Sequence, residues 1–206
     1  MSLNVAIIDY GMGNLHSVYK KLCEFAVSPV IATGAMQVTS ADKIVMPGVG
    51  HFETAISHLK QLGLYDALNE AVLIMKKPIL GICLGMQLMA KGSEEGNAAG
   101  FGWIDANVIR FKITDKTRHK VPQTGWNTVH ICKPSPLFKN INNNTEFYFL
   151  HSYHYENSDP EVILTKTEYE YDFVSAVHAE NIFGTQFHPE KSHKAGTQLL
   201  KNFILM

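Results

Sequence analysis

Short apolar runs alternate with amphipathic segments along the first half of the chain. Apolar runs that predict buried strands cover residues 3–9, 28–32, 43–46 and 79–82. Helical spacing of apolar residues predicts helices over residues 15–25, 52–61 and 65–76. Apolar strands that alternate with helices are typical of a parallel sheet covered on both faces. The first half therefore predicts an α/β core.

The second half has a different pattern, in which strand-like segments follow one another with turn residues between them. These segments cover residues 104–111, 127–132, 145–150, 162–166, 172–178 and 182–187, and a last helix is expected over 192–205. No repeat, low-complexity segment or linker interrupts the chain. We therefore expect one domain over residues 1–206, with a mostly parallel central sheet flanked by helices and antiparallel strands added in the second half.

Composition narrows the classes of function. The chain has 206 residues, 46% of them hydrophobic, and a formal net charge of −1, so it lacks the basic excess typical of a nucleic-acid-binding protein. No apolar run approaches the roughly 20 residues of a membrane helix, and no basic leader precedes the first strand. Three cysteines without paired spacing are typical of reduced thiols. We expect a cytoplasmic protein.

Cys83 is the most informative residue. It follows the apolar run 79–82, precedes a helix expected over 84–90, and has glycine on both sides at Gly81 and Gly85. A reactive residue at a tight strand-to-helix turn is the arrangement of a nucleophile elbow. The helix N-terminus favours negative charge and so favours the thiolate. The other cysteines, Cys23 and Cys132, are expected to be small buried residues.

A base for this thiol lies near the other end of the chain. An apolar strand leads to His188, and Glu190 follows after the rigid Pro189. Cys83, His188 and Glu190 therefore have the chemistry of a nucleophile, a base and a residue that orients the base.

The turn over residues 47–50 is the candidate oxyanion hole. It follows a strand and precedes a helix, and its two glycines allow backbone N–H groups to converge on an anion. In an open α/β sheet this turn and Cys83 lie at the same edge. We expect the backbone of Gly48, Val49 and Gly50, with that of Leu84, to bind the developing oxyanion.

Other motifs are weaker signals. The loop 9–14 lacks a dinucleotide fingerprint and a phosphate-loop lysine, so nucleotide binding is not expected. His151 and His154 have no third ligand beside them, and we expect neither a metal nor any other cofactor. The acidic pair Glu94 and Glu95, expected at the end of the helix that follows Cys83, is either a solvated terminus or a site for a substrate ammonium group.

The combination of Gly81, Cys83, Gly85 and Gln87 with His188, Pro189 and Glu190 resembles class I glutamine amidotransferases. Further segments resemble the glutaminase subunits of imidazole glycerol phosphate synthases: residues 9–15, 47–52, 120–127, 147–153 and 186–192. The resemblance implies hydrolysis of glutamine through a glutamyl thioester. It also implies a heterodimer with a (β/α)₈ synthase subunit, which uses the ammonia to make imidazole glycerol phosphate and AICAR in histidine biosynthesis.

The resemblance also assigns positions to substrate and partner. The residues that match glutamine-binding positions are Gln87, Glu95, Ser152 and Tyr153. The residues that match positions near the partner are Asn14, Trp126 and Lys191, and the segment with Gln123 and Thr124 is expected there as well. The family usually has histidine and methionine where Gln123 and Thr124 stand, so this departure leaves open a specialised paralogue.

Three alternatives remain open. A paralogue would supply ammonia to a similar barrel that amidates a surface-polysaccharide sugar. A stand-alone cysteine peptidase would keep the thiol and the histidine but need no partner, and the Gln87 and 151–153 matches argue against it. A non-catalytic regulatory subunit would be favoured by loss of a triad member, and Cys83, His188 and Glu190 are all present.

Overall fold

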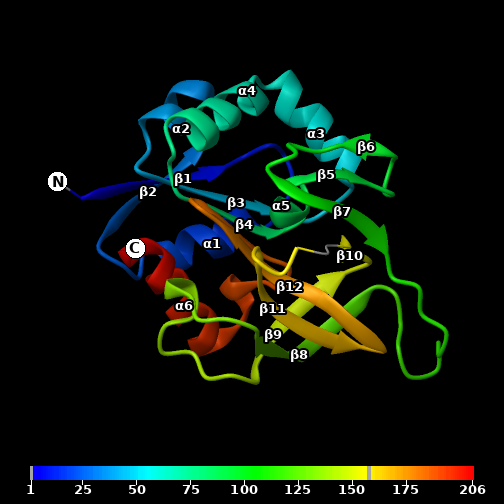
Figure 1. Ribbon diagram of the computed structural model, residues 1–206. Coiled ribbons are helices and arrows are strands. Elements are labelled where there is room, and N and C mark those ends of the chain that lie inside the picture. Colours follow the sequence, from blue (N-terminus) through cyan, green and yellow to red (C-terminus); the bar gives the residue numbers. More distant parts are fainter. Residues whose placement is uncertain (1, 157–158) are drawn as a thin grey trace.

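The computed structural model describes residues 2–156 and 159–206, which form a twisted sheet between two layers of helices (Figure 1). Five parallel strands make its core, in the spatial order β2-β1-β3-β4-β13. Their bounds are β1 Leu3–Ile8, β2 Val27–Ala32, β3 Lys43–Gly48, β4 Ile79–Cys83 and β13 Ile182–Thr185. Because β4 and β13 are neighbours, the segments that carry Cys83 and His188 meet at one sheet edge.

Each face of the parallel core buries its own apolar cluster. Along β1, Ala6 and Ile8 belong to one cluster, and Val5 and Ile7 belong to the other. The first face is covered by α2 Ala35–Ser40, α3 Phe52–Gln61 and α4 Leu64–Asn69, which continues as a π-helical turn over Glu70–Ile74. The second face is covered by α1 Leu15–Leu22 and α6 His193–Leu205.

Mostly antiparallel strands extend the sheet beyond β13, as the second half of the sequence predicts, although β5 pairs with β7 in parallel. The main path continues through β12 Tyr171–Ala179, β10 Tyr153–Glu156, β7 Ile104–Arg110, β5 Ala90–Ser93 and β6 Ala98–Ala99. A branch from β12 runs through β11 Ile163–Tyr169, β8 Gln123–Ile131 and β9 Thr145–His151. β9 ends next to Cys83, since the Leu150 carbonyl oxygen lies 3.6 Å from Sγ.

The helix expected over residues 84–90 is shorter than predicted. α5 covers Leu84–Gln87, and the chain then turns into β5. The Leu88 and Met89 carbonyls accept hydrogen bonds from the N–H groups of Phe101 and Ile104, so the backbone is satisfied without a longer helix. Glu94 and Glu95 therefore follow a strand, which corrects their expected place at a helix end.

Other differences are local. The helix predicted over 15–25 stops at Leu22, and α2, β5, β6 and β10 were not predicted. Cys23 and Cys132 are exposed, which corrects the expectation that both are buried. Cys23 caps the end of α1 and Cys132 directly follows β8, so neither side chain is covered by a second layer.

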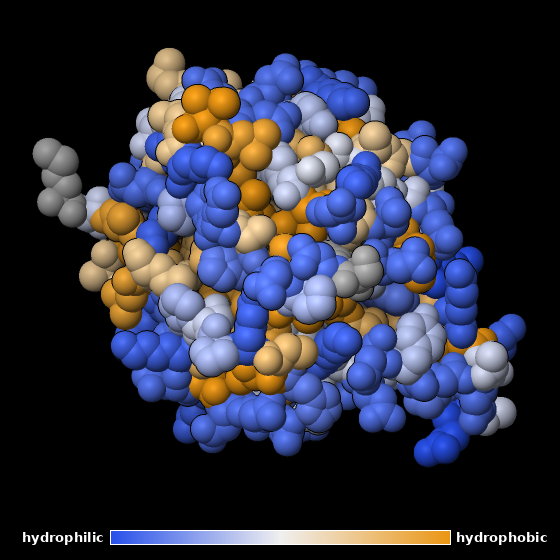
Figure 2. Space-filling model, in the orientation of Figure 1, coloured by the Kyte–Doolittle hydropathy of each residue, from blue (hydrophilic) through white to orange (hydrophobic). Residues whose placement is uncertain are grey.

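Polar residues cover most of the face shown in Figure 2, with apolar atoms scattered between them. Large apolar side chains such as Tyr10, Phe52, Phe147 and Phe187 are fully buried. Within residues 2–156 and 159–206, no helix combines the length and the apolar character that crossing a membrane requires.

Two glycines allow α5 to pack directly on β3 and β4. A Cβ atom at Gly85 would collide with the backbone carbonyl of Met46 on β3. A Cβ atom at Gly81 would lie 2.7 Å from backbone atoms of Gly85 and Met86. These contacts are between backbone atoms, so no side chain can move to relieve them. The turn that carries Cys83 therefore requires glycine at both positions.

We predict that Gly85→Ala lowers the free energy of unfolding by about 1–3 kcal/mol, because α5 must move away from β3. Chemical denaturation of the variant and the wild type measures the difference. Gly34→Ala is the control, since its φ of −150° suits alanine and a Cβ atom there would lie 4.0 Å from the nearest atom, Gln37 Oε1. Because Gly34 is the N-cap of α2, the control should cost at most about 1 kcal/mol, less than Gly85→Ala. An equally stable Gly85→Ala variant would contradict the packing argument.

Candidate active site

Cys83 sits at the strained turn between β4 and α5. Its backbone has φ 54° and ψ −109°, a conformation that residues with a side chain rarely adopt. The side chain is buried except for 4% of its surface, and it lines a small cavity. The structure thus has the geometry of a nucleophile elbow, with the thiol at the first turn of a helix.

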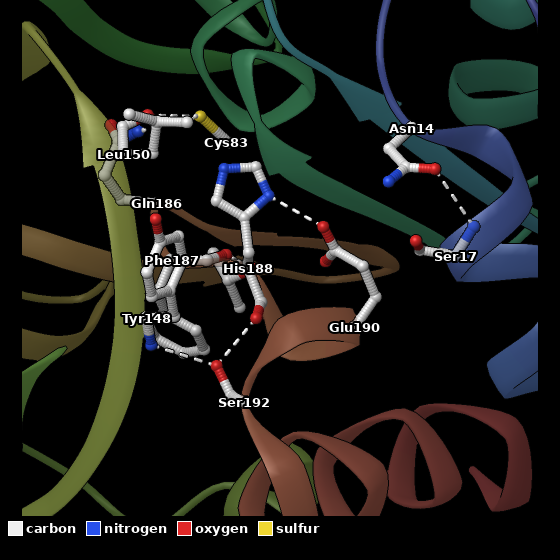
Figure 3. Close-up of polar contacts among 11 residues, drawn as sticks. Asn14, Ser17, Cys83, Tyr148, Leu150, Gln186, Phe187, His188, Glu190 and Ser192 are labelled. Atoms are coloured by element: carbon white, nitrogen blue, oxygen red, sulfur yellow. Dashed lines mark hydrogen bonds and ion pairs between the residues drawn. The ribbon is translucent and has the colours of Figure 1, made fainter. Parts of the chain in front are cut away.

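His188 lies between Cys83 and Glu190 (Figure 3). It follows β13, and a 3₁₀ turn over Pro189–Lys191 brings the Glu190 carboxylate to the edge of the ring. His188 Nδ1 is 2.8 Å from Glu190 Oε1, and both side chains are buried. Ser192 Oγ donates to the His188 carbonyl oxygen and accepts from the Tyr148 N–H, which fixes the turn to β9. The three residues of the predicted triad are therefore brought together.

The charges of this triad support one another. Burial by itself lowers the pKa of His188, but the nearby Cys83 sulfur and the Glu190 carboxylate outweigh burial and raise it to about 10. The second ring nitrogen, Nε2, is buried, lies on the Cys83 side of the ring and has no regular hydrogen-bond partner in the described part of the chain. It is therefore free to exchange a proton with a group held at Cys83.

Two groups besides His188 contact the sulfur. The Leu150 carbonyl oxygen lies 3.6 Å from Sγ, and Gln186 Nε2 lies 3.7 Å from it. The motifs in the sequence assign no role to Gln186, although it lies two residues before His188. Alternation along an extended strand places residues two apart on the same side, and that signal could have identified it.

A cavity of about 230 Å³ opens beside the thiol. The four predicted glutamine-binding residues line this cavity together with Cys83: Gln87, Glu95, Ser152 and Tyr153. Three of the four predicted oxyanion-hole residues line it as well: Val49, Gly50 and Leu84. Glu95 Oε2 also accepts from the Phe52 N–H at the first turn of α3. The Gln87 amide is used internally, because Nε2 donates to the Tyr153 carbonyl oxygen and to Gln186 Oε1.

The turn after β3 runs beside Cys83. Gly48 is the parallel-strand neighbour of Cys83, and a Cβ atom there would collide with the Tyr10 hydroxyl group. Gly50 has φ +142°, which favours glycine, and it lies with Val49 on the cavity wall. The turn therefore lies beside Cys83 and forms part of the wall of the same cavity.

The residues expected at a partner surface fall into two groups. Thr124 and Asn14 are exposed, and Trp126 is 44% exposed and stacks on His193. Lys191 is half-buried, with Nζ 5.6 Å from the centre of the Tyr148 ring.

Gln123 does not lie at the surface, which corrects its expected place near the partner. Only 2% of its surface is exposed, and its amide lies 3.0 Å from His151 Nε2, so the side chain faces the interior. β8 begins at Gln123, earlier than predicted, and strand alternation turns this residue inward and Thr124 outward.

The two histidines that raised a metal interpretation have separate partners. His151 contacts Gln123 and the Tyr153 carbonyl oxygen, whereas His154 contacts the Tyr155 carbonyl oxygen and the Tyr171 hydroxyl group. Burial lowers the pKa of both rings, that of His151 to about 3, so both are neutral near pH 7. In the described parts of the chain, no cluster of three or more His, Cys, Asp or Glu side chains could hold a metal ion.

Known proteins with similar sequences cover nearly the whole chain. The class-I glutamine amidotransferase family matches residues 6–206. "Imidazole glycerol phosphate synthase subunit HisH 2" of Methanococcus maripaludis is 46% identical over 97% of this chain and 98% of its own length. The protein of the same name in Pseudomonas aeruginosa is 42% identical with the same coverage, and "subunit HisH 1" of Campylobacter jejuni is 44% identical.

Solved structures agree on the fold at much lower identity. A putative GMP synthase protein from Thermoplasma acidophilum superimposes with a TM-score of 0.76 at 20% identity, over 99% of this chain and 93% of that one. PurLQS from Thermotoga maritima gives 0.75 at 14% identity, over 100% and 99%. The matches in sequence and the geometry around Cys83 lead to the same assignment: this chain belongs to the class-I glutamine amidotransferases and, within them, to the HisH subunits of imidazole glycerol phosphate synthase.

Proposed function

We propose that this chain hydrolyses glutamine with Cys83, His188 and Glu190, and delivers the ammonia to a (β/α)₈ synthase subunit in histidine biosynthesis. The observation that carries the proposal is the buried pair of His188 and Glu190 beside a cysteine in a strained turn. That geometry suits an enzyme that cleaves amide bonds with a thiol nucleophile. Relatives of nearly equal length carry the name of the synthase subunit.

In the first half-reaction, the Cys83 thiolate attacks the carbonyl carbon of the glutamine side chain. The carbonyl π electrons move to oxygen, and backbone N–H groups at Leu84 and the turn over residues 48–50 bind that oxyanion. The C–N bond then breaks, His188 Nε2 gives its proton to the leaving nitrogen, and ammonia departs. A glutamyl thioester on Cys83 and a neutral His188 remain.

In the second half-reaction, water opens the thioester. Neutral His188 Nε2 takes a proton from the water while the oxygen attacks the thioester carbon. The C–S bond breaks, glutamate leaves, and Cys83 returns as a thiolate beside a protonated His188. Glu190 keeps Nδ1 of the ring protonated and oriented in both halves, which explains why its carboxylate is held at 2.8 Å.

The residues of the cavity wall bind the glutamine substrate. Glu95 is the acidic group there, so we assign it to the substrate ammonium group, with Ser152 and Tyr153 as further polar contacts. Gln87 contributes as a wall residue whose amide is already bonded inside the protein. Its role is therefore to shape the cavity and to hold its neighbours.

For the partner, we assign the exposed side chains near the active-site edge of the sheet, namely those of Asn14, Thr124 and Trp126, together with Lys191. Ammonia is neutral and volatile, and a docked barrel would keep it from the solvent.

A second candidate function is amidation of a surface-polysaccharide sugar by a paralogous pair. It is favoured by the numbered names of two relatives, "HisH 2", since a number indicates more than one such subunit in an organism. Expression of this chain in a strain that lacks its own histidine-pathway glutaminase subunit separates the two. Growth without histidine supports the histidine pathway, and failure to grow despite soluble expression favours the paralogue.

We predict that Cys83→Ala abolishes glutamine turnover, because Cys83 supplies the thiol that lines the cavity. Glutamate release, measured with the synthase partner present, should fall by a factor of about 10³ or more. Cys23→Ala and Cys132→Ala are matched controls on exposed thiols and should keep the wild-type rate. Turnover that survives in Cys83→Ala would disprove the assignment of the nucleophile.

We predict that the isolated chain is a weak glutaminase and that a barrel partner with bound acceptor activates it. Glycine at positions 48 and 50 allows a peptide to reorient, so docking can complete the oxyanion hole. One missing oxyanion donor costs about 10²–10³ in rate, and we expect activation of that size. Steady-state glutamate release with and without the partner measures it. Equal rates in both conditions would refute the gating argument.

A further inference from the structure

A series of hydrogen-bonded, buried side-chain amides connects the cavity wall to the catalytic sulfur. The Tyr153 carbonyl oxygen accepts from Gln87 Nε2 at 2.9 Å, Gln87 Nε2 also donates to Gln186 Oε1 at 3.0 Å, and Gln186 Nε2 lies 3.7 Å from Cys83 Sγ. Gln87 is 4% exposed and Gln186 is fully buried. Water therefore does not compete for these bonds.

One backbone group, the Tyr153 carbonyl, fixes the donor and the acceptor of every hydrogen bond in this series. A carbonyl oxygen only accepts, so the atom of Gln87 that faces Tyr153 must be its nitrogen. That same nitrogen also faces Gln186, so Gln186 must present its oxygen to Gln87. The nitrogen of Gln186 is then left to point at Cys83 Sγ. A reversed Gln186 amide would place two donors together at Gln87 and an oxygen lone pair against the sulfur.

His151 reinforces the same carbonyl. Its Nδ1 lies 2.8 Å from the Tyr153 oxygen and must carry the proton there. On the other side of the ring, Nε2 lies 3.0 Å from Gln123 Oε1. Two donors, from Gln87 and His151, therefore hold the Tyr153 carbonyl in place, and this carbonyl is the first acceptor of the amide series.

We propose that Gln186 is a positioning residue for the nucleophile, whose amide N–H donates to Cys83 Sγ and stabilises the thiolate relative to the thiol. A hydrogen bond to the charged form of a group favours that form. The Leu150 carbonyl, 3.6 Å from Sγ, acts in the opposite direction, because it accepts from a thiol S–H and repels a thiolate. Gln186 offsets this carbonyl and, with His188, favours the thiolate over the thiol.

Other groups around the sulfur do not replace Gln186. Tyr10 stays protonated, because burial and the nearby Cys83 raise its pKa, and its hydroxyl group donates to the Pro47 carbonyl oxygen. His151 is neutral, and Glu95 on the cavity wall is acidic and bonded to the Phe52 N–H. Glu190 acts on the sulfur through His188. Gln186 and His188 are therefore the donors available to the thiolate among the residues described.

The proposal rests on the proposed role of Cys83 and is tested without glutamine or a partner. The probe is iodoacetamide, which carries a primary amide like that of glutamine and reacts with thiolates. Cys23→Ser and Cys132→Ser remove the exposed thiols from the full-length protein, so the alkylation rate reports on Cys83. The midpoint of rate against pH measures ionisation, and the plateau at high pH measures access to the sulfur.

Gln186→Met has nearly the same volume and no N–H donor. We expect its alkylation midpoint to rise by about one pH unit, which corresponds to about tenfold less thiolate at a pH well below the midpoint. Gln198→Met is the matched control: it removes an amide bond to Asn202 on α6, and its midpoint should not move. A Gln186→Met midpoint equal to that of the wild type would overturn the proposal, even if the plateau rate falls.

A second measurement covers the case in which Gln186→Met fails to fold. In the wild-type chain, the side-chain amide protons of Gln186 should shift in an NMR titration with the midpoint seen by alkylation. Signals that stay constant through that titration would overturn the proposal. A missing glutaminase activity with every partner tested would count against the proposed function alone, because the alkylation midpoint and the amide shifts do not depend on it.

Discussion

The close approach of α5 to strands β3 and β4 is the constraint on which the site depends. Without side chains at Gly81 and Gly85, the helix backbone lies against the Met46 carbonyl. The strand must then turn within one residue, and Cys83 takes the strained backbone conformation at that point. Strain of this kind persists only where the surrounding structure enforces it. The buried interior around β4 therefore holds the thiol in the cavity.

The order of the strands supplies the rest of the triad. β13 is the last strand of the chain but lies beside β4, with Thr185 paired to Ile82. This pairing brings His188 to the thiol across more than a hundred residues of sequence. The 3₁₀ turn over Pro189–Lys191 then places the Glu190 carboxylate within hydrogen-bond distance of His188 Nδ1. Electrostatics completes the arrangement, because the charges of the sulfur and the carboxylate outweigh the burial of His188.

The sequence predicted those features that depend on a single segment. Apolar runs identified the parallel strands, and the glycines around Cys83 identified the turn, because both are local patterns. Several features that depend on tertiary pairing were missed, although the triad itself was predicted. The helix after Cys83 stops at Gln87 because residues 101–104 satisfy the Leu88 and Met89 carbonyls. Gln123 faces inward because β8 begins there, and the contact of Gln186 with the sulfur needs β4 and β13 side by side.

The central claim is that Cys83 is the nucleophile of a glutamine-specific site. It is tested most directly by an electrophilic glutamine analogue with a chloroketone in place of the side-chain amide, followed by mass spectrometry of the peptides. We expect one label, on Cys83, and slower labelling when glutamine is added. A label on Cys23, Cys132 or any other residue, or labelling of Cys83 that glutamine does not slow, would contradict it.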